Sequence, residues 1–184
     1  MWFLLSGIFL TNSYLWRFPS FARAQARKVL PKEFSKDEIR QMIPAEVDSR
    51  NLQIDPLDQF GTMGPTDVVV DVTTYRLKIG GAVERPLSLS YDQIIRYPSV
   101  TETVLLICPG FFANNGRWTG VDVKGAYEKM ARIPVEELGK KRIFLAYRVN
   151  GVPLPRRHGF PLRLVFEDAY GDSWVKYVSD LVVS

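Results

Sequence analysis

The first residue of this sequence that could carry chemistry is Cys108, the only cysteine of the chain. It ends the apolar segment VLLIC and is followed by Pro109 and Gly110, so we expect it where a strand gives way to a turn. A thiolate there can act as a nucleophile or as a ligand for a soft metal. The alternative is a cysteine that only packs as a small apolar side chain.

A second group of candidate residues surrounds His158, the only histidine. Residues 156–163 read RRHGFPLR, and Trp174, Val175 and Lys176 follow. Arginine offers forked donors that suit phosphate, and lysine offers a point charge. The alternative for these cations is an ordinary solvated basic loop. Arg163 lies between two leucines of an apolar segment, so it is expected to point away from the core face, either exposed at the rim or paired with an anion.

The low counts of cysteine and histidine exclude several kinds of site. One cysteine excludes an intrachain disulfide framework and a multi-cysteine zinc or iron–sulfur site, and one histidine excludes a multi-histidine metal site. Any metal must therefore use other ligands or arrive inside a cofactor. Residue types alone also allow a hydrolase in which His158 activates Cys108. A net charge of +4 over 184 residues is weak support for nucleic acid, and we expect none as a partner.

The elements that must position these residues are mostly strands. Residues 75–79 (YRLKI) and the AVERPLSLS segment predict a hairpin, and further strands are expected at TETVLLIC, RIFLAYRV, PLRLVFE and WVKYVSDLVVS. Capping boxes at Ser35 and Ser90 predict short helices, Asp122 can cap another over VKGAYEKM, and Asn150-Gly151 predicts a tight turn. Residues 44–66 read as an ordered arm. The fold class predicted is α+β, mostly β in mixed sheets, with short helices and long ordered loops.

The N-terminal segment has the features of an export signal or an anchor. Residues 1–16 carry no charge, although a helix that spans a bilayer needs ~20 apolar residues. Small residues follow at Ala22, Ala24 and Ala26, as near a signal cleavage site. A buried core helix is the alternative. We expect a periplasmic or exported protein, with residues 1–26 as a signal-like segment or with residues 1–16 as a membrane anchor.

Four blocks in this order resemble the molybdopterin domain of the sulfite oxidase family. They are YRLKIGGAVERPLSL, VLLICPG with RWTGV, IFLAYRVNGVPLPRRHGFPLRLV and YGDSWVKYV. The resemblance covers residues 72–184, after an arm over 27–71, and implies the sulfite-oxidase-type molybdopterin-binding fold. The sequence contains the molybdopterin domain without the family's haem and dimerisation domains. This domain composition is similar to that of the periplasmic sulfoxide-reductase branch.

The resemblance implies roles for individual residues. Cys108 would be the thiolate ligand of molybdenum, and the dithiolene of the pterin would supply the other sulfurs. His158 and Arg163 would hold the pterin and its phosphate, and Trp174, Val175 and Lys176 would contact the cofactor. The implied cofactor is molybdenum-molybdopterin, with no haem in this chain.

Two departures from the family pattern limit what can be carried over. On the order of twenty residues, with a strand and a tyrosine near the metal, are missing near 130/131. After the cysteine, Phe111, Phe112, Asn114 and Arg117 replace the anion-binding residues of sulfite-oxidising members. A pocket lined by these four residues would suit a less polar substrate.

The function predicted is an oxidoreductase that transfers an oxygen atom to or from a small substrate that contains sulfur, by sulfoxide-type reduction or sulfite-type oxidation. Its partner would be a separate electron carrier, such as a membrane haem or cytochrome protein. The alternative is a non-catalytic subunit of an electron-transfer complex that retains the fold.

Overall fold

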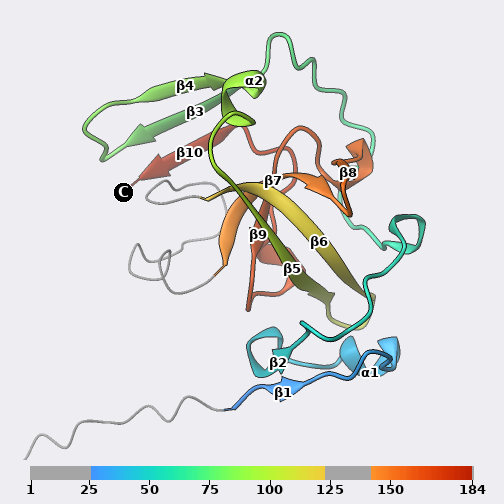
Figure 1. Cartoon of the computed structure of the whole chain (residues 1–184). Coiled ribbons are helices and arrows are strands. Elements are labelled where there is room, and N and C mark those ends of the chain that lie inside the picture. Colours follow the sequence, from blue (N-terminus) through green and yellow to red (C-terminus); the bar gives the residue numbers. More distant parts are fainter. Residues whose placement is uncertain (1–25, 123–141, 184) are drawn as a thin grey trace, which may run out of the picture.

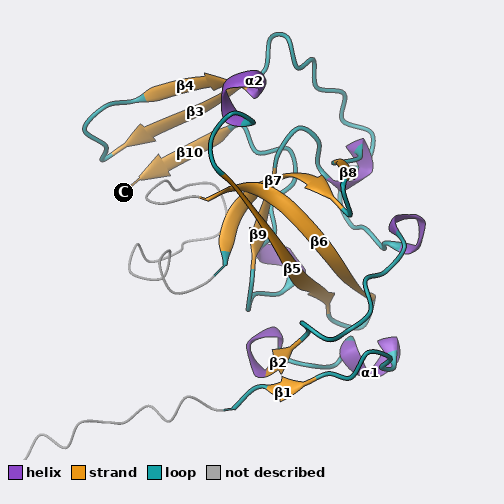
Figure 2. Cartoon of the chain, in the orientation of Figure 1, coloured by secondary structure: helices purple, strands orange, loops and turns teal. Residues whose placement is uncertain are grey.

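A computed structural model describes residues 26–122 and 142–183 of the chain. Strands make up most of its regular structure, and short helices lie between groups of them (Figures 1 and 2). The strands are β1 (Lys28–Val29), β2 (Val47–Asp48), β3 (Arg76–Gly81), β4 (Leu87–Ser90), β5 (Ser99–Cys108), β6 (Phe112–Asp122), β7 (Ile143–Val149), β8 (Val152–Pro153), β9 (Arg163–Phe166) and β10 (Asp180–Val183). The helices are α1 (Lys36–Ile39), α2 (Tyr91–Ile94) and the 3-10 turns η1 (Pro44–Glu46), η2 (Leu57–Gln59), η4 (Arg156–His158) and η5 (Gly171–Ser173).

The largest sheet is antiparallel and runs in the order β5-β6-β7-β8, with β9 also paired to β7. β5 and β6 form a hairpin that pairs from Ser99 opposite Val121 to Cys108 opposite Phe112. The register between β6 and β7 shifts at Thr119/Gly120. A side chain at Gly120 would lie 2.0 Å from the Leu145 carbonyl oxygen, so this irregularity needs a glycine.

A smaller sheet of β10, β3 and β4 lies at the upper left in Figure 1. β3 and β4 are antiparallel, with Leu77 opposite Leu89, and so confirm the predicted hairpin. β10 runs parallel to β3 on its other edge. The third sheet is a parallel pair of β1 and β2, which lies with α1 below the large sheet.

Strand alternation divides the apolar side chains among three clusters, because successive residues face opposite sides of a sheet. Residues 105 and 107 of β5 pack against the N-terminal arm, while Val104 and Leu106 face Trp118 and Trp174. On β7, residues 143, 145 and 147 join the small sheet and residues 144 and 146 face the two tryptophans. The large sheet is therefore covered on both faces, and the Cys108 end of β5 lies between two clusters.

The N-terminal arm is ordered over its described part, as predicted. Ser35 caps α1 by accepting a bond from the Glu38 amide, and Ser90 forms a complete capping box with Gln93 on α2. The predicted amphipathic helix after Ser35 is shorter than expected: Ile39 is fully buried, but Ile43 lies outside α1 and is 47% exposed.

Three features differ from the predicted elements. Residues 112–122 form β6, a strand that is not among the expected elements. The last strand begins only at Asp180, since residues 171–179 form η5 and irregular chain with Tyr177 at a φ of 57°. The predicted helix over VKGAYEKM, the missing segment near 130/131 and residues 1–16 lie outside the described residues. Within the described ranges no helix has the length and apolar character needed to cross a membrane.

The fold class is confirmed: the chain is mostly β, with short helices and long ordered loops.

Candidate functional site

Cys108 is the last residue of β5, and a tight turn carries the chain into β6. The Phe111 amide donates to the Cys108 carbonyl oxygen at 3.0 Å, and Gly110 has a φ of +75°. Proline followed by glycine with positive φ is typical of a type II turn. The predicted strand-to-turn position of Cys108 is therefore confirmed.

The Cys108 side chain is buried, with 8% of the residue exposed. A β-carbon at Gly171 would lie 2.4 Å from Cys108 Sγ, so the start of η5 covers the sulfur directly. Burial raises the pKa of the thiol, Arg163 opposes that rise, and Asp172 adds to it. The free thiol is therefore mainly protonated at neutral pH, and a bound cation would be needed to keep it as thiolate.

Arg163 is buried on the same side of the large sheet. Alternation along β9 places Leu164 with the small-sheet cluster and Val165 with the tryptophan cluster, so Arg163 faces the tryptophans. Its guanidinium carbon lies 5.6 Å from the ring centroids of both Trp118 and Trp174. The expectation that it avoids the leucine face is confirmed, but the alternative of rim exposure is wrong: the residue is 6% exposed.

The buried guanidinium has no acidic partner in the described part of the chain. Nη1 donates to the His158 carbonyl oxygen at 3.0 Å, whereas Nε has no hydrogen-bond partner there. Burial lowers the pKa of Arg163 to about 10, so the group is still charged at neutral pH. A buried cation without a counter-ion is costly, and a bound anion would relieve that cost.

His158 ends η4 and is 2% exposed. Its ring meets Phe60 edge-on at a centroid distance of 5.7 Å, and Nε2 has no partner among the described groups. Burial, and then the positive charges of Arg157, Arg163 and Lys176, lower its pKa to about 4. A neutral imidazole with an unused nitrogen can donate to or accept from a polar ligand.

Lys176 lies against the η4 turn, where a β-carbon at Gly159 would come within 3.0 Å of it. Its ammonium donates to Thr62 Oγ1 at 3.0 Å, to the Pro65 carbonyl at 2.6 Å and to the Arg157 carbonyl at 3.1 Å. Burial, with Arg163 and Arg157, lowers its pKa. The lysine is thus positioned by neutral acceptors only, which leaves its charge available to an anion.

Trp174 and Val175 belong to the same neighbourhood. The Trp174 indole meets that of Trp118 edge-on at 5.5 Å and donates from Nε1 to the Ala169 carbonyl at 3.3 Å. The Val175 carbonyl accepts from the Leu164 amide at 2.8 Å. The structure therefore brings Arg163, Trp174 and Val175 together, with Cys108 and His158 within the electrostatic reach of Arg163.

Three of the four residues predicted to line a substrate pocket, Phe111, Phe112 and Asn114, line one surface cavity with residues of the arm, and Arg117 does not. Phe112 is half-buried against Gly61, whereas Phe111 is 66% exposed. Arg117 pairs with Thr103 on β5, an odd number of residues from Cys108, so it points to the opposite face of the sheet. Arg117 therefore does not share the Cys108 face of the hairpin with Phe112 and Asn114.

Asn114 shares the Cys108 face of the hairpin, but its amide is engaged with the backbone. Oδ1 accepts from the Gly61 amide at 3.0 Å and Nδ2 donates to the Gly61 carbonyl at 2.9 Å. This geometry holds the arm against β6. A polar side chain predicted to meet substrate thus has a structural partner for both of its polar atoms.

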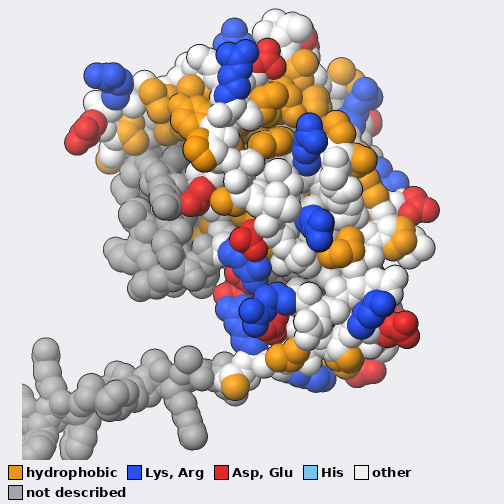
Figure 3. All heavy atoms as spheres, viewed as in Figure 1, with side chains coloured by type: hydrophobic (Ala, Val, Ile, Leu, Met, Phe, Trp, Pro, Cys, Tyr) orange, Lys and Arg blue, Asp and Glu red, His pale blue; other side chains and the backbone are white. Residues whose placement is uncertain are grey.

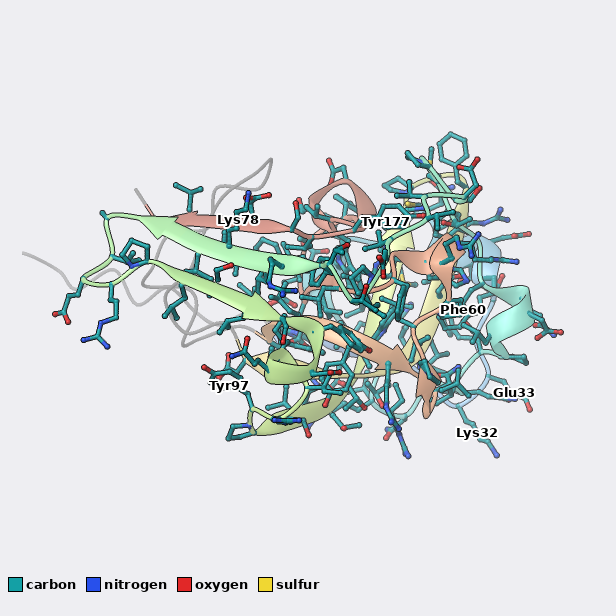
Figure 4. The ribbon with its side chains drawn as sticks, turned by 90° about the horizontal axis from the view of Figure 1, so that it is seen from above. Lys32, Glu33, Phe60, Lys78, Tyr97 and Tyr177 are labelled. Carbon is teal, nitrogen blue, oxygen red and sulfur yellow. The ribbon has the colours of Figure 1, made fainter. Side chains whose placement is uncertain are left out.

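Two residues of the site, Thr62 and Trp118, were not among the candidates predicted from the sequence. Trp118 would have been found if β6 had been recognised, because it lies on the Cys108 side of that strand. The contribution of Phe60 and Thr62 depends on the path of the arm, which no local pattern specifies. Figure 4 shows Phe60 toward the end of the molecule that also holds Lys32 and Glu33, far from Lys78 and Tyr97.

The arrangement fits an anionic, sulfur-binding cofactor better than a hydrolytic pair. No hydrogen bond joins Cys108 to His158 in the described residues. The histidine pKa is lowered and the thiol pKa raised, the reverse of what a thiolate–imidazolium pair needs. No cluster of three metal-ligating side chains occurs between residues 26 and 122 or 142 and 183. The fit rests instead on Cys108 as one soft ligand and on the buried Arg163 and His158, each of which has a nitrogen without a partner among the described residues.

Comparison with protein families gives one matching model, described as an oxidoreductase molybdopterin binding domain. It matches residues 63–129 and 117–184, two stretches that overlap over residues 117–129. Together these pieces cover most of the chain. The missing segment near 130/131 stays a prediction.

Similar curated proteins include the uncharacterized oxidoreductase YuiH of Bacillus subtilis, 28% identical over 119 residues, with 54% of this chain and 60% of that protein covered. Mitochondrial sulfite oxidase of Macaca fascicularis is 30% identical over 165 residues, with 62% of this chain and 30% of that protein covered. This chain thus spans from under a third to about three fifths of the length of these relatives.

Among solved structures, the sulfane dehydrogenase SoxCD of Paracoccus pantotrophus has a similar fold. The TM-score is 0.57 and the sequence identity is 24%, with 67% of this chain and 44% of that chain covered. At this identity the likeness concerns the fold alone.

Proposed function

Because the chain belongs to the oxidoreductase molybdopterin-binding domain family, we propose that it binds molybdenum-molybdopterin and transfers an oxygen atom to or from a small substrate. One observation carries the proposal beyond the family match. Buried Arg163 and His158 each retain a nitrogen without a described partner, on the side of the sheet that holds the buried Cys108 thiol. These groups complement an anion and a soft metal.

When bound, the cofactor supplies a metal that exchanges an oxygen atom with substrate and electrons with a partner. The Cys108 sulfur would be the protein ligand of that metal, and Gly171 leaves the sulfur its space. Arg163 and Lys176 would hold the phosphate, and His158 would hold the pterin. The two indoles around Arg163 restrict the directions in which its donors can point, which orients the group and excludes water.

We further propose that the substrate is a less polar sulfur compound than sulfite. The cation expected in the pocket, Arg117, faces away from Cys108, while Phe112 lies on the Cys108 side. Arg163 and Lys176 would be engaged by the cofactor. A pocket with few free cations favours a neutral substrate such as a sulfoxide over a charged one.

A separate electron carrier, such as a membrane haem or cytochrome protein, would complete the cycle. Oxygen-atom transfer changes the oxidation state of the metal by two electrons, so another protein must supply or remove them. We also propose export to the periplasm, with residues 1–26 as signal or residues 1–16 as an anchor. N-terminal sequencing of protein from the periplasmic and membrane fractions would test this: cleavage after Ala26 supports a signal, and an intact start in the cytosol contradicts export.

Metal and pterin analysis of the full chain tests the proposed function. We expect about one molybdenum and one pterin per chain, and faster reduction of a sulfoxide than oxidation of sulfite with an artificial electron carrier. Cys108→Ser should abolish turnover. Wild-type protein without molybdenum and pterin would refute the proposal. Cofactor without any response to electron donors or acceptors would favour the alternative, a non-catalytic subunit.

A further inference from the structure

The Cys108 turn is poorly fixed by its own packing. Pro109 and Gly110 are exposed, and so is the Phe111 side chain. Within the turn, one hydrogen bond joins Phe111 to Cys108. Exposed backbone hydrogen bonds such as this one exchange readily with water. Pairing of Cys108 with Phe112 fixes the strands at the base of the turn, so contacts from outside the turn decide how firmly residues 109–111 are held.

One residue of the N-terminal arm makes two bonds to this turn. Arg40 Nη1 donates to the Phe111 carbonyl oxygen at 3.0 Å, and the Gly110 amide donates to the Arg40 carbonyl oxygen at 3.2 Å. Asp37 holds the same guanidinium through a salt bridge. The two bonds join Gly110 and Phe111, in the second half of the turn, to a single residue of the arm.

Arg40 is itself firmly placed. It follows Ile39, which is fully buried against Leu105 and Ile107 of β5. α1 thus packs beneath the end of the strand that carries Cys108, and Arg40 reaches from this anchored helix to the turn. A change in α1 would be transmitted over a short distance to the cysteine.

We propose that Arg40 is a positioning residue for Cys108, which fixes the turn so that the sulfur is presented in one place. Arg40 does not touch the sulfur itself. Gly171 limits the sulfur from the opposite side, so the backbone clamp and the glycine contact together leave it little freedom. The role as a ligand-positioning residue rests on the proposed function, but the clamp itself does not.

Alkylation of the cofactor-free full chain by iodoacetamide tests the clamp, because Cys108 is the only thiol that can react. Arg40→Ala should speed labelling about five- to tenfold, the factor expected when local opening loses one partly exposed hydrogen bond of ordinary strength. Arg40→Lys, which keeps the charge and one donor, should give an intermediate rate. Arg50→Ala is the matched control, since Arg50 pairs with Asp48 in the same arm without touching the turn.

Urea denaturation of each variant separates local opening from global unfolding. Arg40→Ala labelling that equals the Arg50→Ala rate, or that only tracks a fall in global stability, would overturn the proposal. In molybdenum-loaded protein, Arg40→Ala should also change the electron paramagnetic resonance spectrum while Arg50→Ala does not. If the wild type never takes up molybdenum, the proposed function fails, whereas the labelling result still decides whether the clamp exists.

Discussion

The Cys108 sulfur is confined by a residue that has no side chain. A β-carbon at Gly171 would lie 2.4 Å from Sγ and 3.1 Å from Leu106 Cδ1. At Gly80 on β3, a β-carbon would meet nothing within 4 Å, and φ is not positive there. The two glycines thus offer a crowded and an open position for the same substitution.

Gly171→Ala should displace the thiol and lower the free energy of unfolding by about 1–3 kcal/mol through overpacking. Molybdenum content should fall as well, since the ligand is moved. Urea denaturation and metal analysis measure both, with Gly80→Ala as control and little change expected there. Equal behaviour of the two variants would show that Gly171 does not confine the sulfur.

His158 should make stability depend on pH in the cofactor-free protein. Its pKa is about 4 in the folded chain, against 6.5 when unperturbed, because of burial and nearby cations. The unfolded chain therefore binds a proton between these values that the folded chain does not bind. The stability present above pH 6.5 is lost as the pH falls toward 4, by up to roughly 3 kcal/mol at about 1.4 kcal/mol per unit.

Urea denaturation of wild type and His158→Gln at about pH 7.5 and about pH 5 measures this effect. The chain has one histidine, and most carboxylates titrate below this range. The Gln variant should therefore show a flatter dependence. Parallel curves for the two proteins would contradict the assignment.

At the scale of single residues, the sequence predicted which side of a strand a side chain faces better than how deeply that side chain is buried. The alternation of Leu162, Arg163 and Leu164 placed Arg163 opposite the leucines, which is correct. It could not reveal that Trp118, from a strand the pattern did not indicate, covers that second face. Asn114 was predicted as a pocket residue from its position after Cys108. Its bond to Gly61 could not be foreseen, because Gly61 lies 53 positions away in sequence.

At the scale of elements, β6 is the principal miss. Residues 112–118 read FANNGRW, and asparagine and glycine have low strand propensity. The strand forms because β5 pairs along its whole length with it, and tertiary pairing outweighs local preference. The β3–β4 hairpin, α2 and the Asn150-Gly151 turn were predictable because their signals are local.

The asparagines whose low strand propensity argued against a strand at β6 connect this strand to the arm. Asn114 binds both polar backbone atoms of Gly61, and Asn115 donates to the Leu52 and Gln53 carbonyls. The Asp55 carboxylate in turn accepts from the Asn115 amide at 2.7 Å. β6 therefore binds residues 52–61 of the arm through these hydrogen bonds.

Asn114→Ala should release the arm at Gly61 and lower the free energy of unfolding by about 1–3 kcal/mol, as expected for buried partners left unpaired. Limited proteolysis should then cut within residues 56–66 faster than in wild type. Thr101→Ala removes an exposed side-chain contact to Thr119 in the same hairpin and should change stability by no more than about 0.5 kcal/mol. Comparable losses in both variants would argue against a special role of Asn114.

At the scale of the whole molecule, an ion network joins segments that are far apart in sequence. Arg142, just before β7, binds the Glu167 carboxylate with two nitrogens and reaches Glu102 of β5 at 3.1 Å. Arg27 at the start of the arm pairs with Asp168 at 2.7 Å and lies 3.7 Å from Glu167. Figure 3 shows basic and acidic side chains mixed in one patch on the lower part of the face in view. Ion pairs of this one network thus connect the arm, the large sheet and the residues just after β9.

Arg142→Met should lower the free energy of unfolding by about 2–4 kcal/mol, because it leaves the half-buried Glu167 carboxylate without its forked partner. Arg50→Met should cost less, about 1–2 kcal/mol, because the Arg50 side chain is 72% exposed although its Asp48 partner is only 12% exposed. Urea denaturation at low salt and at about 1 M NaCl separates the two cases, because salt screens exposed pairs more than covered ones. Most of the Arg142 effect should persist at high salt. A loss that disappears in 1 M salt would mean that the network acts only as a surface pair and does not hold the arm to the sheet.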